Sequence, residues 1–308
     1  MGSGSWSTNV YDAAERYRTA SGTGAFAYSD HVRSSSPRGS WVAHPSLEPK
    51  GLTARESRDS DEHPTSLAIS VLFDVTGSMG GVPRVLQTKL PDLFGLLLRK
   101  GYTEHPQILF GGVGDATCDR VPLQLGQFES DNRMDEQLGN ILLEGGGGGQ
   151  MTESYELALY AMARHTALDC HEKRGRKGYL FLIGDEMPYG KVKAREVRDV
   201  LGDRLERDIP LPEILAELRR KFHVFYILPA GASYAGNPEV LTLWRRLLGQ
   251  NVIELDDLDA VCETIALTVG LGEEAIDLAT GLADLAEIGS TAGTSVARAL
   301  SSLQGQNS

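Results

Sequence analysis

The segment LAISVLFDVTGSM, residues 67–79, gives the strongest indication of the fold and of a possible functional site. Its first seven residues are apolar apart from Ser70, as in a buried strand, and they lead directly into Asp74. Alternate side chains of an extended segment point the same way, so Asp74, Thr76 and Ser78 can converge on one point. Such oxygens suit a hard divalent cation, but a strand passing through an ordinary Asx-turn into a helix would need no ion. The segment alone leaves both interpretations open.

From residue 66 onward, short apolar strands alternate with helices. The pattern predicts further strands at 107–113, 122–128, 179–183, 223–228 and 252–255. It predicts helices at 82–100, 131–143, 152–168, 192–205, 211–221, 238–248 and 257–269, and Pro91 predicts a kink or break in the first of them. We therefore expect a doubly wound, mainly parallel α/β sheet flanked by helices.

Acidic residues follow three of the predicted strands: Asp74, Asp115 and Asp185. Ligand sites of parallel sheets lie beyond the carboxyl ends of the strands, where the strand order switches. These carboxylates are thus expected at one edge of the sheet. Asp115 is as good a candidate for capping a turn or helix as for the rim of a site.

The segment Asp74-Val75-Thr76-Gly77-Ser78-Met79 resembles the metal-ion-dependent adhesion site of von Willebrand factor A domains, whose pattern is D-x-S-x-S. Thr76 stands where serine is usual and keeps the hydroxyl. Two later parts of that site have counterparts in the right order: Thr152, after the glycine run 145–149, and Asp185, after a central strand. The glycine run blurs the register, so Glu153 or Ser154 could take the place of Thr152. The resemblance covers about residues 66–270.

The resemblance implies that Thr76, Ser78 and Thr152 contact a cation directly, and that Asp74 and Asp185 do so directly or through water. Mg²⁺ is the first candidate, with Mn²⁺ and Ca²⁺ as alternatives. In the family, the open coordination position attracts a carboxylate from a protein partner, and glycines 145–149 would let the loop shift as it binds. We therefore expect a metal-dependent interaction or assembly module with an acidic protein partner. By analogy with cytoplasmic members of the family, which often work beside such motors, an AAA+ ATPase is one candidate for that partner.

Two segments flank this domain. Residues 1–65 are rich in Ser and Gly with scattered aromatics, and only 10–20 looks helical, so we expect an irregular arm that lies on the domain or on a neighbouring subunit. Residues 271–308 read as an amphipathic helical tail that packs on the domain or binds a partner helix. A homo-oligomer assembled through these segments, with the fold as scaffold, is the alternative function.

The amino-acid composition limits the classes of binding partner and the cell compartment that we expect. The net charge of −12 argues against nucleic-acid binding and against anionic membranes, and the basic run 173–177 is interpreted as a solvated loop. Three widely spaced cysteines, no apolar run of about 18 residues and no signal-peptide pattern favour a cytoplasmic protein of bacterial or phage type.

Sequence motifs of catalysis are missing. No G-K-[ST] follows the glycine run, and neither H-E-x-x-H nor G-x-S-x-G occurs. A phosphoaspartyl hydrolase requires a second carboxylate two residues after its nucleophilic aspartate, and Thr76 occupies that position after Asp74. We therefore expect no enzyme, although Asp74 with Asp185 and Glu186 could hold Mg²⁺ for phosphoryl chemistry, which keeps a metal-dependent hydrolase as a third alternative.

Overall fold

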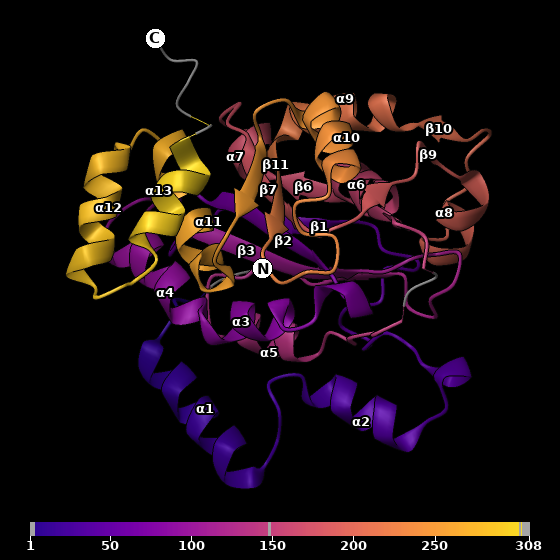
Figure 1. Cartoon of the computed structure of the whole chain (residues 1–308), viewed down its shortest axis with the longest axis horizontal. Helices are drawn as coiled ribbons and strands as arrows, with labels where there is room; N and C mark the ends of the chain where they lie inside the picture. Colours follow the sequence, from indigo (N-terminus) through magenta and orange to yellow (C-terminus); the bar gives the residue numbers. More distant parts are fainter. Residues whose placement is uncertain (1–3, 147–148, 302, 304–308) are drawn as a thin grey trace.

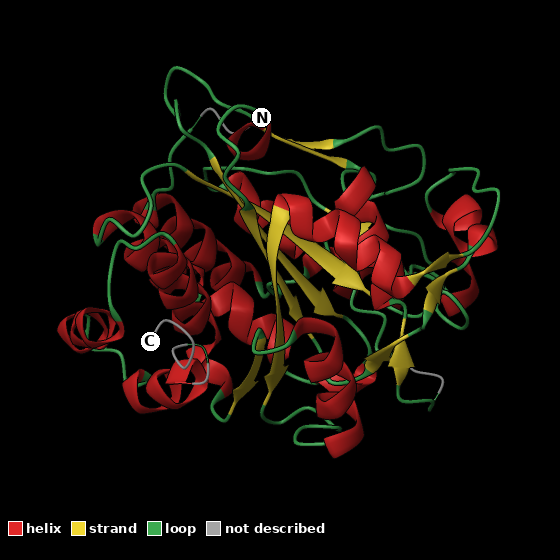
Figure 2. Cartoon of the chain, turned by 90° about the horizontal axis from the view of Figure 1, so that it is seen from above, coloured by secondary structure: helices red, strands yellow, loops and turns green. Residues whose placement is uncertain are grey.

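The computed structural model describes residues 4–146, 149–301 and 303. Its centre is a six-stranded sheet in the order β12-β11-β7-β2-β3-β4, with helices on both faces (Figures 1 and 2). The first five strands in that order are parallel, and β4 runs antiparallel to β3. This is the mainly parallel α/β architecture that the sequence predicts. The strands are β2 (Leu67–Asp74), β3 (Pro106–Val113), β4 (Leu123–Leu125), β7 (Gly178–Ile183), β11 (Phe222–Pro229) and β12 (Val252–Leu255).

The central strands send alternate side chains into two separate cores. In β2, Ile69, Val71 and Phe73 join one buried cluster, whereas Ala68 and Leu72 join the other. The first core lies under α3 (Val82–Thr88), α4 (Leu90–Phe94), α5 (Arg133–Gly139) and α11 (Val261–Gly272). The second lies under α6 (Tyr155–Arg164), α8 (Ala194–Val200), α9 (Leu211–Lys221) and α10 (Pro238–Leu248). Burial on both faces explains why the strands read as continuous apolar runs.

The strand order changes direction at β2. The chain passes from β2 to β3 on one side, and the later strands β7, β11 and β12 lie on the other side. The carboxyl ends of β2 and β7 therefore flank the place where open α/β sheets bind their ligands.

Several predicted boundaries are wrong. The helix expected at 82–100 is divided into α3, α4 and a π-helical turn, Gly95–Arg99, so the break predicted from Pro91 is confirmed. The helix expected through residue 168 ends at Arg164, because Thr166–Leu168 (β6) pairs with Arg55–Ser57 (β1) of the arm. The helix expected at 192–205 covers only α8, because Lys191–Val192 (β9) pairs with Ile209–Pro210 (β10). Strand β4 and helix α5 are also shorter than predicted.

The arm is more regular than its composition suggests. It contains α1 (Thr8–Ser21), α2 (Ala27–Ser35), a 3₁₀ turn (Arg38–Ser40) and β1, so the prediction of an irregular segment is wrong for this part. Figure 1 shows α1 and α2 against the same side of the domain as α3 and α5. The ring of Trp6 stacks on that of Phe94, with the ring centroids 4.6 Å apart. Other arm residues complete the first core: Tyr11, Phe26 and Leu47. The arm thus lies on the domain of its own chain.

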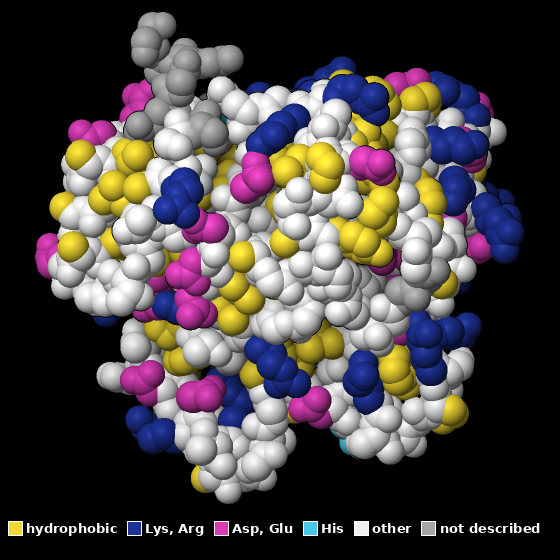
Figure 3. Space-filling view, in the orientation of Figure 1, with side chains coloured by type: hydrophobic (Ala, Val, Ile, Leu, Met, Phe, Trp, Pro, Cys, Tyr) yellow, Lys and Arg dark blue, Asp and Glu magenta, His cyan; other side chains and the backbone are white. Residues whose placement is uncertain are grey.

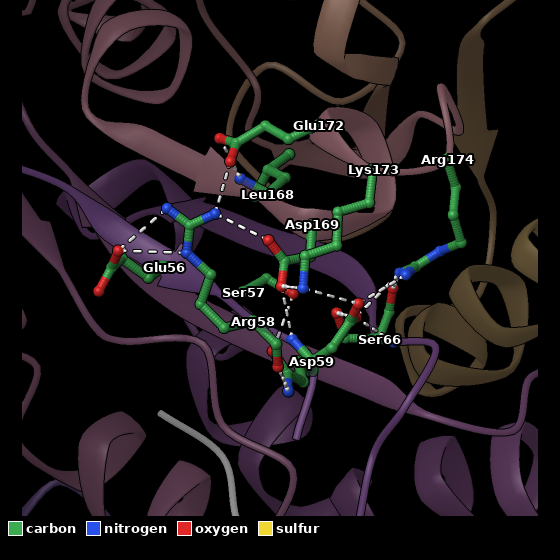
Figure 4. A network of polar contacts seen from close by, with 11 residues as sticks. Glu56, Ser57, Arg58, Asp59, Ser66, Leu168, Asp169, Glu172, Lys173 and Arg174 are labelled. Carbon is green, nitrogen blue, oxygen red and sulfur yellow. Dashed lines mark hydrogen bonds and ion pairs between the residues drawn. The ribbon is translucent and has the colours of Figure 1, made fainter. Parts of the chain in front are cut away.

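An ionic network holds the end of the arm (Figure 4). Arg58 forms an ion pair with Asp169 at 2.8 Å. Asp59 forms ion pairs with Arg174 at 2.8 Å and with Lys173 at 3.2 Å. The basic run 173–177 is an exposed loop, as expected, and the arm partly neutralises its charge.

The tail packs beside α11 as α12 (Leu278–Glu287) and α13 (Gly293–Ser301), and its residues Leu285, Val296 and Leu300 are fully buried. Within the described ranges, no helix combines the length and the apolar character needed to cross a membrane. Both signs of charge are present on the face shown in Figure 3, with Lys and Arg most frequent around α8 and β9.

Candidate metal centre

The loop that follows β2 turns its polar side chains onto Asp74. The Asp74 carboxylate is fully buried, and its Oδ1 accepts hydrogen bonds from the backbone N–H of Thr76 (2.7 Å) and from the Thr76 hydroxyl (2.5 Å). The hydroxyls of Thr76 and Ser78 lie 3.1 Å apart. The convergence expected from alternate side chains therefore occurs, in a loop that is also an Asx-type turn.

A second carboxylate reaches the same loop from the neighbouring strand. Asp185 follows β7, and its Oδ1 accepts a hydrogen bond of 2.8 Å from the Ser78 hydroxyl. Its Oδ2 accepts the backbone N–H of Tyr234, after β11, at 2.9 Å. The structure thus brings together four of the five predicted site residues: Asp74, Thr76, Ser78 and Asp185.

The helix behind the site supplies one further donor. The hydroxyl of Tyr155, in the first turn of α6, donates to Asp74 Oδ2 at 2.9 Å. Gly184 leaves room for it, because a Cβ at that position would overlap the Tyr155 hydroxyl. Sequence reasoning missed Tyr155, whose spacing resembles that of any apolar helix residue.

Loops close over these side chains. The N–H of Gly77 donates to the carbonyl of Gly146 (2.8 Å), and the N–H of Ser233 donates to the carbonyl of Ser78 (3.0 Å). A Cβ on Gly77 would lie 3.2 Å from the carbonyl oxygens of Gly145 and Gly146, a close approach that favours glycine at this position. Of the glycine run, 147–148 lie outside the described residues.

The fifth predicted residue, Thr152, lies in a short strand, β5 (Thr152–Glu153), that pairs with β8 (Met187–Pro188). Its side chain lies close to that of Tyr189. The next residue, Glu153, instead groups with Asp74: carboxylate oxygens of Asp74, Glu153 and Glu186 all lie within 4.8 Å of one another. Glu153 is one of the two residues that the alternative registers of the sequence place at the third position.

Burial dominates the electrostatics of the group. It raises the pKa of Asp74 to about 7, with the charge of Asp185 adding to the rise, while the hydrogen bonds from Thr76 and Tyr155 act against it. Burial also raises the pKa of Glu153 and of Glu186, and neighbouring carboxylates raise both further. Carboxylates crowded in this way at neutral pH are stabilised by a proton or by a cation.

Asp115 belongs to an adjoining loop. It accepts hydrogen bonds from the N–H and the hydroxyl of Thr117 (2.9 and 2.7 Å), from the side-chain amide of Gln150 (2.6 Å) and from the Tyr189 hydroxyl (3.1 Å). This is the pattern of a turn-capping aspartate, and Asp115 lies outside the group of oxygens around Asp74.

Comparison with known proteins adds little. No family model matches the chain, and no curated protein matches it. Among solved structures, the pilus adhesin SpaC from Lactobacillus rhamnosus GG in its open conformation aligns at 10% identity over 73% of this chain, with a TM-score of 0.45. Proximal thread matrix protein 1 from the mussel byssus aligns at 12% identity over 68%, with a TM-score of 0.43. This chain spans 31% of the adhesin and 48% of the matrix protein, and neither likeness is strong enough to assign a function.

Proposed function

We propose that this chain is an interaction module whose contact surface depends on a divalent cation, Mg²⁺ in the first place, bound at the carboxyl ends of β2 and β7. The proposal also assigns the mainly parallel α/β fold to a specific type: a doubly wound domain like those of von Willebrand factor A, over residues 66–270. The resemblance of the segment 74–79 and the strand order support that assignment.

One observation carries the proposal: Asp74, Thr76, Ser78 and Asp185 form a continuous hydrogen-bonded series. Asp185 is 107 residues away from Ser78 in the chain, yet its carboxylate meets the same loop. Carboxylate and hydroxyl oxygens are the ligands that hard divalent cations prefer, so the donor set fits Mg²⁺, Mn²⁺ or Ca²⁺.

The cation would act on a partner through the loops around it. The loop after β2, the glycine loop and the loop after β11 already meet at Gly77 and Ser78 through backbone hydrogen bonds. A cation held by carboxylates behind these loops would fix them in one arrangement, and its removal would leave like charges that repel one another. Binding of a partner to this surface would then require the ion.

The same geometry favours interaction over catalysis. A metal-dependent hydrolase needs a base or nucleophile that can reach a substrate beside the ion. Asp74 and Asp185 are fully buried, and each already accepts hydrogen bonds at both carboxylate oxygens. We therefore assign them to holding the ion and the loops.

The test is a binding experiment with the immobilised chain and an extract of its source cells, in Mg²⁺ or in EDTA. Proteins should be retained in Mg²⁺ and lost in EDTA, and also lost with Asp185→Ala as bait. Asp199→Ala, which removes an exposed carboxylate of α8, should retain them like the wild type. Retention that is the same in EDTA and with the Asp185 variant would contradict the proposal.

A further inference from the structure

Two glutamates outside the predicted ligand set lie at this site. Glu153 in β5 and Glu186, directly after Asp185, are 1% and 7% exposed. One carboxylate oxygen from each lies within 4.8 Å of the other and of an Asp74 oxygen. Oxygen ligands lie about 2.0–2.1 Å from Mg²⁺ and about 2.3–2.6 Å from Ca²⁺, so two ligands of one ion are at most about 4–5 Å apart. Oxygens within 4.8 Å of one another can therefore share one Ca²⁺, and they would draw slightly closer around Mg²⁺.

The bonding of the two glutamates is incomplete. Oε2 of Glu153 and Oε2 of Glu186 are buried, and no donor group in the described part of the chain reaches them; the two carboxyl groups are close enough to share a proton with each other. A buried polar atom without a partner costs about 1–3 kcal/mol, and more when it carries charge. Asp74 and Asp185, by contrast, have donors at both oxygens. Within the group around Asp74, the oxygens that lack a donor are thus Oε2 of the two glutamates, and a cation would satisfy both, as would a proton shared between them.

From this geometry we infer that Glu153 and Glu186 are ligands of the cation and that, with Asp74, they form a three-carboxylate centre. This rests on the proposed function, because it concerns the same site. It changes the ligand set, since Glu153 replaces Thr152, whose side chain contacts Tyr189. Thr76 and Ser78 add neutral oxygens to the centre, and Asp185 holds Ser78 in place.

The ligand set also defines the chemistry of the partner. When Asp74, Glu153 and Glu186 are ionised as ligands of a divalent ion, their three negative charges exceed the two positive charges of the ion. Such a centre has no surplus positive charge to attract a carboxylate. The partner group that faces this ion is therefore neutral or cationic, and the acidic contact implied by the family resemblance is not the one that this site favours.

The test uses Mn²⁺ alone as the probe, with the full chain, and follows the free ion by its paramagnetic resonance signal. Glu153→Gln and Glu186→Gln keep the side-chain volume and remove the charge. Each should weaken Mn²⁺ binding at least about 10-fold, since loss of even an indirect partner of a metal ligand costs about 10- to 100-fold. Each should also keep or raise the melting temperature in EDTA, because a repelling carboxylate has been removed. A merely structural role would not produce these opposite effects.

Glu156→Gln is the matched control. Glu156 is equally buried and lies in the same helical turn as Tyr155, and it lies outside the three-carboxylate group. Its Oε2 accepts the backbone N–H of Tyr189, and its Oε1, like Oε2 of the two glutamates, lacks a donor within the described part of the chain. It should bind Mn²⁺ like the wild type. Wild-type affinity in both the Glu153 and Glu186 variants, beside loss of binding in Asp74→Ala, would overturn the inference and leave the proposed function standing. Melting temperatures of those two variants that fall by several degrees in EDTA would also overturn it. No Mn²⁺ binding by the wild type would overturn both.

Discussion

Replacing Tyr155 by phenylalanine removes a single hydroxyl from the wall of the site. That hydroxyl donates to Asp74 Oδ2 at 2.9 Å, and the ring stays packed edge-on against Tyr226 and Trp244, at centroid distances of 6.2 and 5.7 Å. The variant should therefore keep the packing of α6 and lose only the hydrogen bond to the carboxylate.

A hydrogen bond to a charged group contributes about 1.5–3 kcal/mol. Cation binding requires the ionised form of Asp74, which is the form that the Tyr155 hydroxyl stabilises. Since about 1.4 kcal/mol corresponds to a tenfold change in affinity, Tyr155→Phe should weaken Mg²⁺ binding by about 10- to 150-fold. Titration of the EDTA-stripped variant by calorimetry measures the change.

Tyr160→Phe is the control for this experiment. Tyr160 lies on the same helix, is equally buried, and donates to a carboxylate away from the site, Asp203 Oδ2, at 2.7 Å. It should lower the melting temperature slightly and leave Mg²⁺ affinity unchanged. The reasoning is refuted if Tyr155→Phe binds Mg²⁺ like the wild type, or if both variants lose affinity equally.

Three further predictions concern the site and its supports. The pKa of Asp74 is raised from its ordinary value of 3.8 to about 7, so between these values the folded state binds more protons than the unfolded one. The free energy of unfolding in EDTA should therefore fall as pH rises from about 4 to 7, and urea midpoints that rise over this range would contradict the pKa. Gly77→Ala should push the glycine loop away, since its Cβ would lie 3.2 Å from two carbonyl oxygens of that loop, and should speed proteolysis there; a wild-type cleavage rate would count against the close approach. Arg58→Ala removes the 2.8 Å ion pair with Asp169, which keeps Lys173 at 2.7 Å, and should lower the free energy of unfolding by about 0.5–1.5 kcal/mol in urea titrations. The exposed Arg195→Ala should change it by less than about 0.5 kcal/mol, and equal effects would show that the arm network adds nothing.

Much of the fold follows from local pattern. The strands of the central sheet are continuous apolar runs because both of their faces are buried, and α9, α10 and β12 lie where the periodicity predicts them. The errors have a common cause, which is pairing with distant segments. Residues 166–168 look like the end of a helix, but they leave α6 to pair with β1 of the arm, more than 100 residues earlier. The local sequence pattern does not indicate which distant segment a strand will pair with.

For the candidate site too, one part could be predicted from local sequence and another part could not. Asp74, Thr76 and Ser78 could be identified because they share one loop, and Asp185 because it ends a neighbouring buried strand. The register after the glycine run could not be derived from spacing, because a flexible loop does not fix which side chain turns inward. In the structure, β5 pairs with β8, and Glu153 lies close to Glu186 while Thr152 lies close to Tyr189.

The central claim is that a divalent cation binds at Asp74, and calorimetric titration of the EDTA-stripped chain with Mg²⁺ and with Mn²⁺ tests it most directly. The account predicts saturable binding at one site in the wild type and none in Asp74→Ala. Equal binding by the variant would place the ion elsewhere, and a wild-type chain that binds neither ion would contradict the account.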